Sequence, residues 1–578
     1  MKRLYYFLVV LLLTVACNSR KESPDKAGGT IKMCLESKPQ NFLTYEISDY
    51  YSAIVFSQIM EGLTSIDTKT LKINPQIASN WTISDDGLIY TFEIRNDIYF
   101  HPHEVFGSKS DRLLTIDDII ASFELFCTPT KNGTESFAYG HYLKNSIKGA
   151  EEFFQKKAKN ISGITQVGDR LKIELIQKDD NFLYKLALIQ LSIHSKKIIE
   201  QEKLTDLIGT GPYVNSNQQK EQEYSLAKNR DYYQIDAEGY HLPYLDSVKF
   251  IIQHQKLAQL ELFENQQVDM ILALPTSKIT RMVEGRLSDF NSTPPRLILD
   301  KNALLQTHYY LFNMQDPRFG DIRVRQAFNY AFNREKMGRE VLKNQFDELG
   351  NFGITPPISQ IFRGYDFNMV KHVGYEFNLA KAKQLLAQAG YPEGKGFGTV
   401  NLRYTIGDIN SAVADEFSQQ IYQNLGIIVN IDGSNFEQLI SDAIAGKGDL
   451  FMNSWVADYP NPENFLSNFL TSNIPNKSSN KLGLNYSKYS NELFDNLLDL
   501  AAKESNIGAK MKLYTKAEVE LMKNPPLIPL WYSGDLQIVH SYIRNLHFNA
   551  LSLFNFKQVY IKPWTAEEYQ KESIKKSN

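Results

Sequence analysis

Residues 321–331 carry the sequence DIRVRQAFNYA, the most informative stretch of the chain for its fold. Its apolar residues fall at positions 324, 327, 328 and 331, a spacing that predicts one buried face of an α-helix. Asp321 stands at the helix start beside two arginines, which favours an ion pair that belongs to the scaffold. A second stripe of the same spacing runs over residues 378–389 and stops at Gly390, a typical residue for a helix C-terminus.

Strand-like segments alternate with such helices along the chain. Residues 90–94 alternate apolar and polar side chains and predict a strand, as do residues 171–176 and 427–431. A helix is predicted to begin at Thr115, a capping residue that is followed three positions later by Asp118. The mixture predicts α/β or α+β architecture with several sheets.

Length and composition narrow the class of protein. The chain has 578 residues, of which 63 are Lys or Arg and 66 are Asp or Glu, so its formal net charge is −3. Hydrophobic residues make up 43% of the chain, and the mean hydropathy is −0.35. These values exclude an intrinsically disordered chain and argue against a polytopic membrane protein or a dedicated nucleic-acid binder. The length predicts roughly three to four domain-sized units.

The N-terminus has the features of an export signal. The positive residues Lys2 and Arg3 precede an apolar run at 4–13 that would rise only about 15 Å as a helix, against about 30 Å for a bilayer core. The following LTVAC, ending at Cys17, resembles the lipobox of bacterial lipoproteins. This resemblance implies a signal peptide over residues 1–16, acylation of Cys17, and a flexible tether over residues 17–29. The alternative is an ordinary signal peptide in which Cys17 is incidental.

Two further cysteines, Cys34 and Cys127, follow the signal. Export permits a disulfide between them. Two buried free thiols that pack as small apolar residues are the favoured alternative. Because the sequence does not give the distance between them, both alternatives stay open.

Catalytic motifs are absent from the sequence. It contains no H-E-x-x-H, no G-x-S-x-G and no complete G-x-x-x-x-G-K-[ST]. The glycine-rich residues 394–398 favour a turn. His101 and His103, in the stretch HPHE, have the residue types of a metal site without a full set of ligands. We therefore expect neither enzyme activity nor a cofactor or metal.

Eight stretches form an ordered series along the chain. They are MEGL at 60–63, NPQIASNW at 74–81, YTFEIR at 90–95, GTGPY at 209–213, KNRDYY at 228–233, the segment 313–331, AGYP at 389–392 and SWVADYPNPENF at 454–465. In this order they resemble the family 5 extracellular solute-binding proteins of bacterial ABC importers, above all the oligopeptide- and dipeptide-binding proteins. Their shared order over about 500 residues argues against chance.

The resemblance implies an α/β, two-lobed, periplasmic-binding-protein-like (type II) fold with an inserted subdomain in the first lobe. Its divisions would be residues 30–62, 207–304 and 533–565 for lobe I, 63–206 for the inserted subdomain, 305–532 for lobe II and 566–578 for a C-terminal tail. Two crossing strands would form a hinge. The cleft would close because ligand contacts from both lobes favour the closed state.

Asp458 is the predicted ligand anchor. In the peptide-binding branch, the Asp of a Trp-x-x-Asp stretch pairs with the free α-ammonium of the ligand, and Trp455 and Asp458 have that spacing. An ammonium removed from water requires an opposite charge and hydrogen-bond acceptors. The backbone of Ser454 to Val456 would pair with the peptide as an added strand. Alternatively, Asp458 caps a turn before Pro460.

Four further cleft residues are implied more weakly. Tyr139 resembles a cleft residue of the oligopeptide branch, with a position in the core as an equal alternative. Tyr50 lies near the N-terminal ligand loop of the family. Trp531 and Tyr532 follow a proline-rich extended segment that would return to the cleft.

The chain departs from the oligopeptide binders where those proteins meet the carboxylate of the ligand. By ungapped spacing, Ala443 and Met452 stand in place of two arginines, and Asn410 stands in place of a histidine. The ammonium anchor is therefore kept while the carboxylate partners are not. This favours longer peptides with an exposed C-terminus, or a different cationic or polar solute.

The implied function is that of a membrane-tethered solute-binding component of an ABC importer that captures peptides. Its partners would be the peptide, the permease subunits with their ATPase, and the membrane through the N-terminal lipid, with no nucleic acid among them. We expect a monomer in the bacterial cell envelope that faces the periplasm. The alternatives are an oligosaccharide, a nickel chelate or another cationic solute as ligand, or a sensing lipoprotein without a role in transport.

Overall fold

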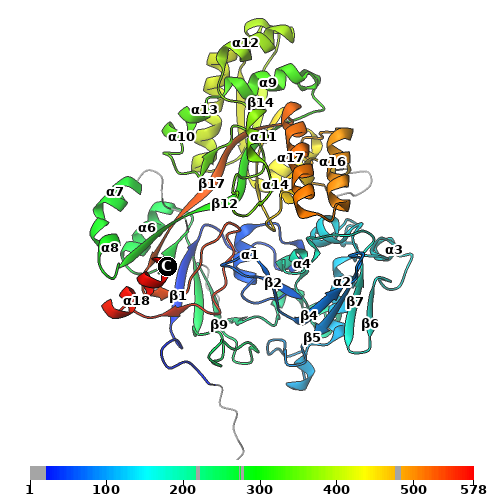
Figure 1. Cartoon of the computed structure of the whole chain (residues 1–578), viewed down its shortest axis with the longest axis vertical. Helices are drawn as coiled ribbons and strands as arrows, with labels where there is room; N and C mark the ends of the chain where they lie inside the picture. Colours follow the sequence, from blue (N-terminus) through cyan, green and yellow to red (C-terminus); the bar gives the residue numbers. More distant parts are fainter. Residues whose placement is uncertain (1–20, 217–221, 273, 275–278, 476–482, 578) are drawn as a thin grey trace, which may run out of the picture.

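Two long antiparallel strands tie the molecule together. β12 (Leu297–Phe312) and β17 (Leu527–His540) pair along most of their length and run from the broad end of a pear-shaped molecule into its narrow end (Figure 1). The computed structural model describes residues 21–577 apart from 217–221, 273, 275–278 and 476–482.

An eleven-stranded sheet extends to both sides of this pair. Toward the narrow end it continues through β16 (Leu450–Val456), β14 (Val400–Thr405) and β15 (Val429–Ser434), and β13 (Glu348–Leu349) pairs with β17. We call this part lobe II. Toward the broad end it continues through β11 (Met270–Ile271), β1 (Thr30–Leu35), β10 (Ser247–Ile252), β9 (Glu223–Lys228) and β8 (Tyr213–Asn215), which we call lobe I.

The two long strands change register between Ala303 and Thr307. On the lobe I side of this break, β17 pairs with β11 through Ile538 and Val539. On the lobe II side, β12 pairs with β16 along residues 306–312. A bulge bends a ladder and increases its twist. The irregularity therefore lies where the sheet passes from one lobe to the other.

A separate four-stranded antiparallel sheet builds the part that we call the insert. Its strand order is β4 (Ala78–Ile83), β5 (Ile89–Ile94), β7 (Arg170–Glu174) and β6 (Ile164–Val167). The strands predicted at 90–94 and 171–176 are confirmed as β5 and β7. The helix predicted from Thr115 is α2 (Ile116–Phe126), and its capping box joins Thr115 and Asp118 as expected.

The helix of the opening stretch is confirmed as α9 (Ile322–Ala331) of lobe II. Asp321 caps it and pairs with Arg323 at 2.6 Å, as predicted for a scaffold ion pair. Arg325 instead lies in the interior and donates to the carbonyl of Pro525 (3.1 Å). The second stripe forms α12 (Leu379–Gln388), which ends before Gly390, where φ is +98°. The strand expected at 427–431 is shifted by two or three residues, to β15.

One buried carboxylate fastens a loop to the body of lobe II. Glu518, on α17 (Ile507–Lys523), is 1% exposed. It accepts hydrogen bonds from the backbone N–H groups of Ile354 (2.5 Å) and Thr355 (2.9 Å). The hydroxyls of Thr355 (2.5 Å) and Tyr365 also donate hydrogen bonds to this carboxylate. Four donors therefore converge on one carboxylate within a single lobe.

The segment before β1 is docked on lobe I. Residues 21–29 were expected within a flexible tether, but Ser23 is buried and the backbone N–H of Gly28 donates to the carbonyl of Tyr244 (2.8 Å). Lys228 also pairs with Glu22 at 2.8 Å. Since these contacts order the segment, its described part is not a free linker. The predicted lipidation site, Cys17, lies outside the described residues.

Cys34, Cys127, His101 and His103 all lie in packed or hydrogen-bonded positions. Cys34 and Cys127 are buried free thiols, so the favoured alternative is confirmed. His101 is buried against the carbonyl of Gly211 (3.0 Å), and His103 pairs with Asp206 (3.1 Å). Across the described ranges, no group of three or more His, Cys, Asp or Glu residues is placed to hold a metal ion.

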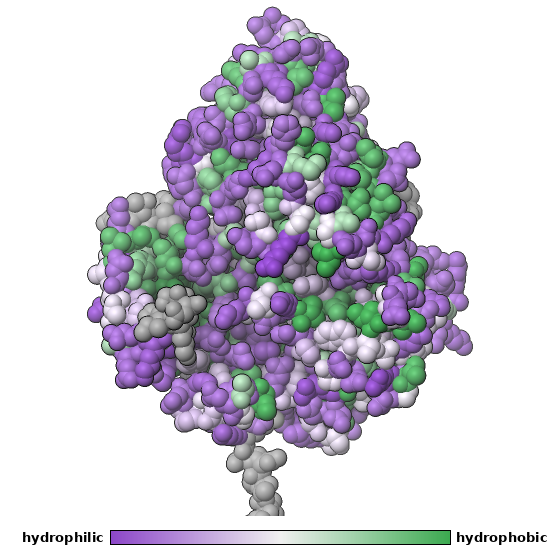
Figure 2. All heavy atoms as spheres, viewed as in Figure 1, coloured by the Kyte–Doolittle hydropathy of each residue, from purple (hydrophilic) through white to green (hydrophobic). Residues whose placement is uncertain are grey.

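Hydrophilic residues cover most of the face shown in Figure 2. Hydrophobic residues gather there in limited patches, one of them over α6 (Lys256–Glu264) and α8 (Leu287–Asn291), where Leu257 and Leu287 are exposed. In the part of the chain that the structure describes, no helix has the length and apolar character needed to cross a membrane.

Candidate functional site

The last residues of β16 present an unpaired strand edge. On one side, β12 pairs with β16 as far as Val456, opposite Gln306. On the other side, and within the described residues, β14 pairs with β16 only at Leu450 and Phe451. Ser454 beyond this point is exposed. An extended chain laid along such an edge can add to the sheet by main-chain hydrogen bonds.

Asp458 follows this edge and faces the insert. Its side chain is half-buried, and its carboxylate accepts a hydrogen bond from the side-chain amide of Asn464 (3.3 Å). The hydroxyl of Tyr142, from the π-helical turn Tyr139–Leu143 of the insert, lies beside the same carboxylate. Among the described residues, no Lys or Arg side-chain nitrogen lies within 4.0 Å of the Asp458 carboxylate oxygens, the limit for an ion pair. Lys185, which acts on it from a longer distance, is paired with Asp179 instead (2.7 Å).

The environment of Asp458 disfavours its charged form. Burial raises the pKa of Asp458 to about 6, and the nearby Glu463 acts in the same direction. Asn464, Tyr142 and Lys185 act in the opposite direction without restoring the ordinary pKa. At neutral pH the carboxylate is thus an anion that its neighbours satisfy only in part. A cation that reached it would make strong charge-assisted hydrogen bonds.

Asn464 joins the two residues of the predicted anchor stretch. Its side-chain oxygen accepts hydrogen bonds from the indole N–H of Trp455 (2.9 Å) and from the backbone N–H of Asp458 (3.0 Å). Its amide nitrogen donates to the carboxylate of Asp458, as described above. Asn464 is 5% exposed, so this link is shielded from water. It fixes Trp455 and Asp458 relative to each other at the end of β16.

Polar contacts join the insert to lobe II around this site. The amide of Asn461 donates to Asn181 (2.9 Å), and the amide of Asn181 lies 3.4 Å from the Glu463 carboxylate. Lys510 of lobe II pairs with Asp180 of the insert. Asp458 therefore lies where two parts of the molecule that are remote in sequence meet.

Two of the weaker predictions correspond to core positions. Tyr139 is fully buried, stacks on Phe154 with 4.6 Å between ring centroids, and donates its hydroxyl to Glu151. Tyr532 is also fully buried, and its hydroxyl donates to the carbonyl of Gly353 (2.8 Å). The hydroxyl of Tyr139 is satisfied within the insert and that of Tyr532 within lobe II, as is typical of core positions.

The other two weaker predictions lie nearer to the lobe boundary. Trp531 is 5% exposed and stacks on His308, with 4.0 Å between ring centroids. His308 is paired in the sheet with Ser454, so Trp531 shares a sheet region with the unpaired edge. Tyr50 opens α1 (Tyr50–Phe56) of lobe I and lies beside Asp535 of β17.

The three positions that replace basic residues offer no cation to a ligand. Ala443 and Met452 are 2% and 5% exposed, within the cores of lobe II. The amide of Asn410 donates to the carbonyl of Thr405 (3.0 Å). These positions serve packing and local hydrogen bonding.

Tyr142 and Asn464 are the site residues that sequence reasoning missed. Asn464 lies inside the quoted stretch 454–465, so its six-residue separation from Asp458 was available as a signal. Tyr142 follows Tyr139, the residue predicted from the sequence, by three positions in the π-helical turn. The hydroxyl of Tyr139 donates to Glu151, whereas that of Tyr142 lies beside Asp458. No periodicity rule for α-helices indicates that difference.

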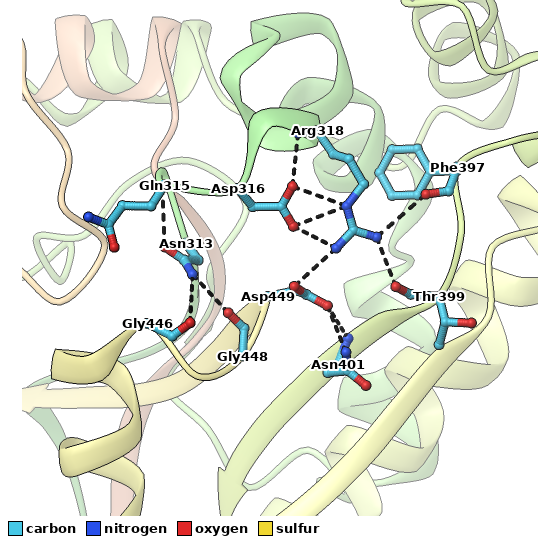
Figure 3. Close-up of polar contacts among 10 residues, drawn as sticks. All are labelled: Asn313, Gln315, Asp316, Arg318, Phe397, Thr399, Asn401, Gly446, Gly448 and Asp449. Atoms are coloured by element: carbon cyan, nitrogen blue, oxygen red, sulfur yellow. Dashed lines mark hydrogen bonds and ion pairs between the residues drawn. The ribbon is translucent and has the colours of Figure 1, made fainter.

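Another cavity lies elsewhere, on lobe II. It has a volume of about 560 Å³ and lies at the start of β16, whereas Asp458 follows its end. Arg318 closes a network there: it pairs with Asp316 (2.5 Å) and Asp449 (3.0 Å) and donates to the carbonyl of Thr399 (2.8 Å), as Figure 3 shows. Asp449 also accepts from Asn401 (2.7 Å). Because these charges satisfy one another, the network is a scaffold that joins strand ends.

Comparison with known proteins identifies the fold and the family. The family model of the bacterial extracellular solute-binding proteins, family 5, matches residues 72–477. Heme-binding protein A of Haemophilus influenzae is 25% identical over 533 residues, which cover 89% of each chain. Di/tripeptide-binding protein 1 of Pseudomonas aeruginosa is 24% identical over 553 residues, covering 93% of this chain and 95% of the relative.

A solved structure shares the whole architecture. The periplasmic binding protein DppA of Helicobacter pylori, an ABC-transporter-associated protein in complex with the peptide STSA, superposes with a TM-score of 0.77. It is 24% identical in sequence, and the alignment covers 93% of this chain and 99% of that one. The two-lobed periplasmic-binding-protein-like fold expected from the sequence is thereby confirmed. The chain belongs to the bacterial extracellular solute-binding proteins, family 5.

Proposed function

We propose that this protein is the solute-binding component of an ABC importer and captures peptides between lobe II and the rest of the molecule. The single observation that carries the proposal is Asp458. It is a half-buried carboxylate at the meeting of two parts of the fold, with neutral donors around it and no ion-pair partner in the described part of the chain. A peptide α-ammonium supplies the missing charge and several donors at once.

The unpaired edge of β16 supports a peptide over other solutes. A ligand whose ammonium lies at Asp458 would find the backbone of Asn453 to Val456 directly beside it. Main-chain pairing along that edge uses the backbone N–H and C=O groups that all peptides share, so it tolerates different side chains. The relatives carry names for different ligands, heme and di- or tripeptides, so family membership alone does not determine the solute. The choice of a peptide in this proposal rests on the site residues.

The missing basic residues support peptides whose C-terminus stays outside the site. Ala443 and Met452 are packed in the core, and the amide of Asn410 is already bonded to Thr405. A ligand carboxylate would find no guanidinium at these positions. We therefore expect C-terminal amidation to change the affinity little, because the carboxylate makes no ion pair that amidation would remove.

The broader setting follows from the same proposal. The division into lobe I, inserted subdomain, lobe II and tail fits a hinge at the register break between Ala303 and Thr307. Ligand contacts from both sides would close the molecule into the form that the permease subunits and their ATPase recognise. Acylation of Cys17 would tether a monomer to the membrane in the cell envelope, facing the periplasm. The docked residues 21–29 shorten the segment available as a spacer.

Calorimetric titration of a tripeptide, Ala-Ala-Ala, against the wild-type chain and Asp458→Asn tests the anchor. Removing one partner of a desolvated charge pair costs about 2–5 kcal/mol, so the affinity should fall by at least about thirtyfold. N-acetylated Ala-Ala-Ala lacks the ammonium and should bind the wild-type chain as weakly as the free peptide binds the variant.

Arg323→Gln is the matched control, because it removes an exposed charge from α9 and should leave the affinity unchanged. If Asp458→Asn binds Ala-Ala-Ala as tightly as the wild-type chain does, the anchor assignment is wrong. If the acetylated peptide binds as well as the free one, the ligand is not recognised through an ammonium.

A further inference from the structure

The chain segment that follows β7 in the insert lies against lobe II. Asp180 pairs with Lys510 of α17, and the ammonium of Lys178 donates to the hydroxyl of Ser505, just before that helix (3.1 Å). Asn181 of the same segment also contacts lobe II, as described above. Asp180 and Lys510 are 330 positions apart in the chain. Only the folded arrangement of the insert and lobe II therefore brings this ion pair together.

The insert is fastened to lobe I by contacts that are more deeply buried. Glu61 of lobe I is 5% exposed and accepts hydrogen bonds from the hydroxyl of Thr210 (2.8 Å), also in lobe I, and from the side-chain amide of Gln76 in the insert. The backbone N–H of His101 in the insert donates to the carbonyl of Gly209 (2.8 Å). Breaking buried hydrogen bonds of this kind is costly. A rotation at the register break between the lobes would therefore part the insert from lobe II and not from lobe I.

Lys510 is the more buried member of the ion pair. It is 5% exposed, whereas the side chain of Asp180 is 37% exposed. Among the described residues Lys510 has no second ion-pair partner, and Glu463 acts on it only from a longer distance. An ammonium withdrawn from water is costly unless an anion lies beside it. Asp180 supplies that anion while the insert and lobe II are in contact, and water would replace it once they part.

We propose that the ion pair of Asp180 and Lys510 is an interlobe latch, which favours the closed form of the molecule even without a ligand. An interaction that exists only in the closed form adds its free energy to that form alone. A ligand that binds only the closed form has an apparent affinity that scales with the closed fraction. The latch therefore raises the affinity for every peptide by the same factor, without touching the ligand. The inference rests on the proposed function, because it requires a cleft that closes on a ligand at Asp458.

The unequal burial of the two partners predicts unequal effects of removing them. Asp180→Asn leaves the buried Lys510 with only the distant Glu463, so the affinity for a peptide should fall by about tenfold. Lys510→Met leaves a carboxylate that water and Lys178 (3.4 Å) still stabilise, so the loss should be about threefold or less. The double variant replaces both charges by neutral groups and should bind more tightly than Asp180→Asn alone.

Calorimetric titration of the full chain and these three variants with two unrelated tripeptides, Ala-Ala-Ala and Phe-Gly-Leu, tests the latch. Each variant should weaken the two peptides by the same factor, because the change lies in the closed fraction and not in the ligand contacts. Glu174→Gln is the matched control. It removes the carboxylate that pairs with Lys148 (2.6 Å) inside the insert, so it should leave both affinities unchanged.

Acetylation of lysines, followed by mass spectrometry, measures closure without a ligand. Lys512 lies two positions from Lys510 on α17 and is exposed, so it serves as the internal reference. In the wild-type chain Lys510 should react more slowly than Lys512. Asp180→Asn should raise the rate at Lys510 by about threefold or more relative to Lys512, because the molecule is open for more of the time. Saturating Ala-Ala-Ala should slow the reaction at Lys510 again.

The outcomes separate this inference from the proposed function. Unequal losses for the two tripeptides would show that the pair acts through the ligand, and unchanged affinity in Asp180→Asn would show that it does not set closure. Either result would overturn the latch, while a loss of affinity in Asp458→Asn would leave the proposed function standing. If neither tripeptide binds the wild-type chain, the proposed function fails, and the acetylation rate of Lys510 alone then decides whether the pair closes the molecule.

Discussion

Two carboxylates in this molecule, Glu518 and Asp458, are withdrawn from water without an ion-pair partner in the described chain, and they differ in what surrounds them. Glu518 accepts from two backbone N–H groups and two hydroxyls, all from lobe II. Asp458 accepts from one amide of its own lobe and has one tyrosine hydroxyl of the insert beside it. Burial raises the pKa of both groups.

The difference separates a structural carboxylate from the proposed ligand anchor. A carboxylate has about four lone-pair positions, and at Glu518 four donors fill them. At Asp458 part of that capacity is unused, and the group lies at a boundary that can open. A desolvated anion with unused acceptor capacity is costly unless something else completes it. Burial alone does not separate the two roles, whereas a count of the donors and the lobes that supply them does.

The largest expected effect concerns Glu518. In Glu518→Gln an amide nitrogen replaces one acceptor oxygen, so the Thr355 and Tyr365 hydroxyls must turn to accept from it, and the buried donors lose their carboxylate acceptor. We expect the free energy of unfolding to fall by about 2–4 kcal/mol, measured by urea denaturation. Asp458→Asn should change it by less than about 1 kcal/mol, because the asparagine can still bond Asn464 and Tyr142. Equal losses in the two variants would remove the distinction drawn between the two carboxylates.

The sequence predicted two helices of lobe II, because their signals are local. The apolar spacing at 324, 327, 328 and 331 and the stop at Gly390 correspond to α9 and α12. The same holds for the capping box of Thr115 and Asp118 in the insert. Each of these depends on residues within one or two turns, so no tertiary information is needed.

The sequence brought candidate-site residues together only where they are neighbours in the chain. Trp455 and Asp458 lie in one stretch, but Tyr142 comes from more than 300 positions earlier, and only folding brings it to Asp458. Tyr139 and Tyr532 show the converse: an aromatic residue with a polar group suits a cleft or a core equally well until its hydroxyl partner is known. The docking of residues 21–29 likewise depends on partners as distant as Tyr244.

A pH titration of peptide affinity sharpens the comparison. The pKa of the free Asp458 is about 6, and an ammonium beside it lowers that pKa in the complex because it favours the charged form. Binding must therefore weaken as the pH falls through 6. Between pH 7 and pH 5 we expect the affinity for Ala-Ala-Ala to fall by about tenfold, or about 1.4 kcal/mol. Above about pH 8 the peptide amine itself loses its proton, so the affinity falls again.

The titration needs controls for the groups near Asp458. Glu463 also has a raised pKa, chiefly through burial, so Glu463→Gln is titrated in parallel and should keep the fall between pH 7 and pH 5. Asp458→Asn should be flat over the same range. A fall that survives in Asp458→Asn and vanishes in Glu463→Gln would move the anchor from one carboxylate to the other.

The smallest expected effects come from the two tyrosines, since each presents its hydroxyl to one of the two carboxylates. Tyr365→Phe removes a donor from Glu518 and should lower the free energy of unfolding by about 1 kcal/mol without changing peptide affinity. Tyr142→Phe removes the hydroxyl beside Asp458, and it should weaken the binding of Ala-Ala-Ala by about three- to tenfold with little change in stability. Calorimetric titration and urea denaturation of both variants give the four numbers required. A stability loss in Tyr142→Phe with unchanged affinity would make Tyr142 a packing residue like Tyr365, and the donor count at Asp458 would then describe the scaffold and not a site that a ligand completes.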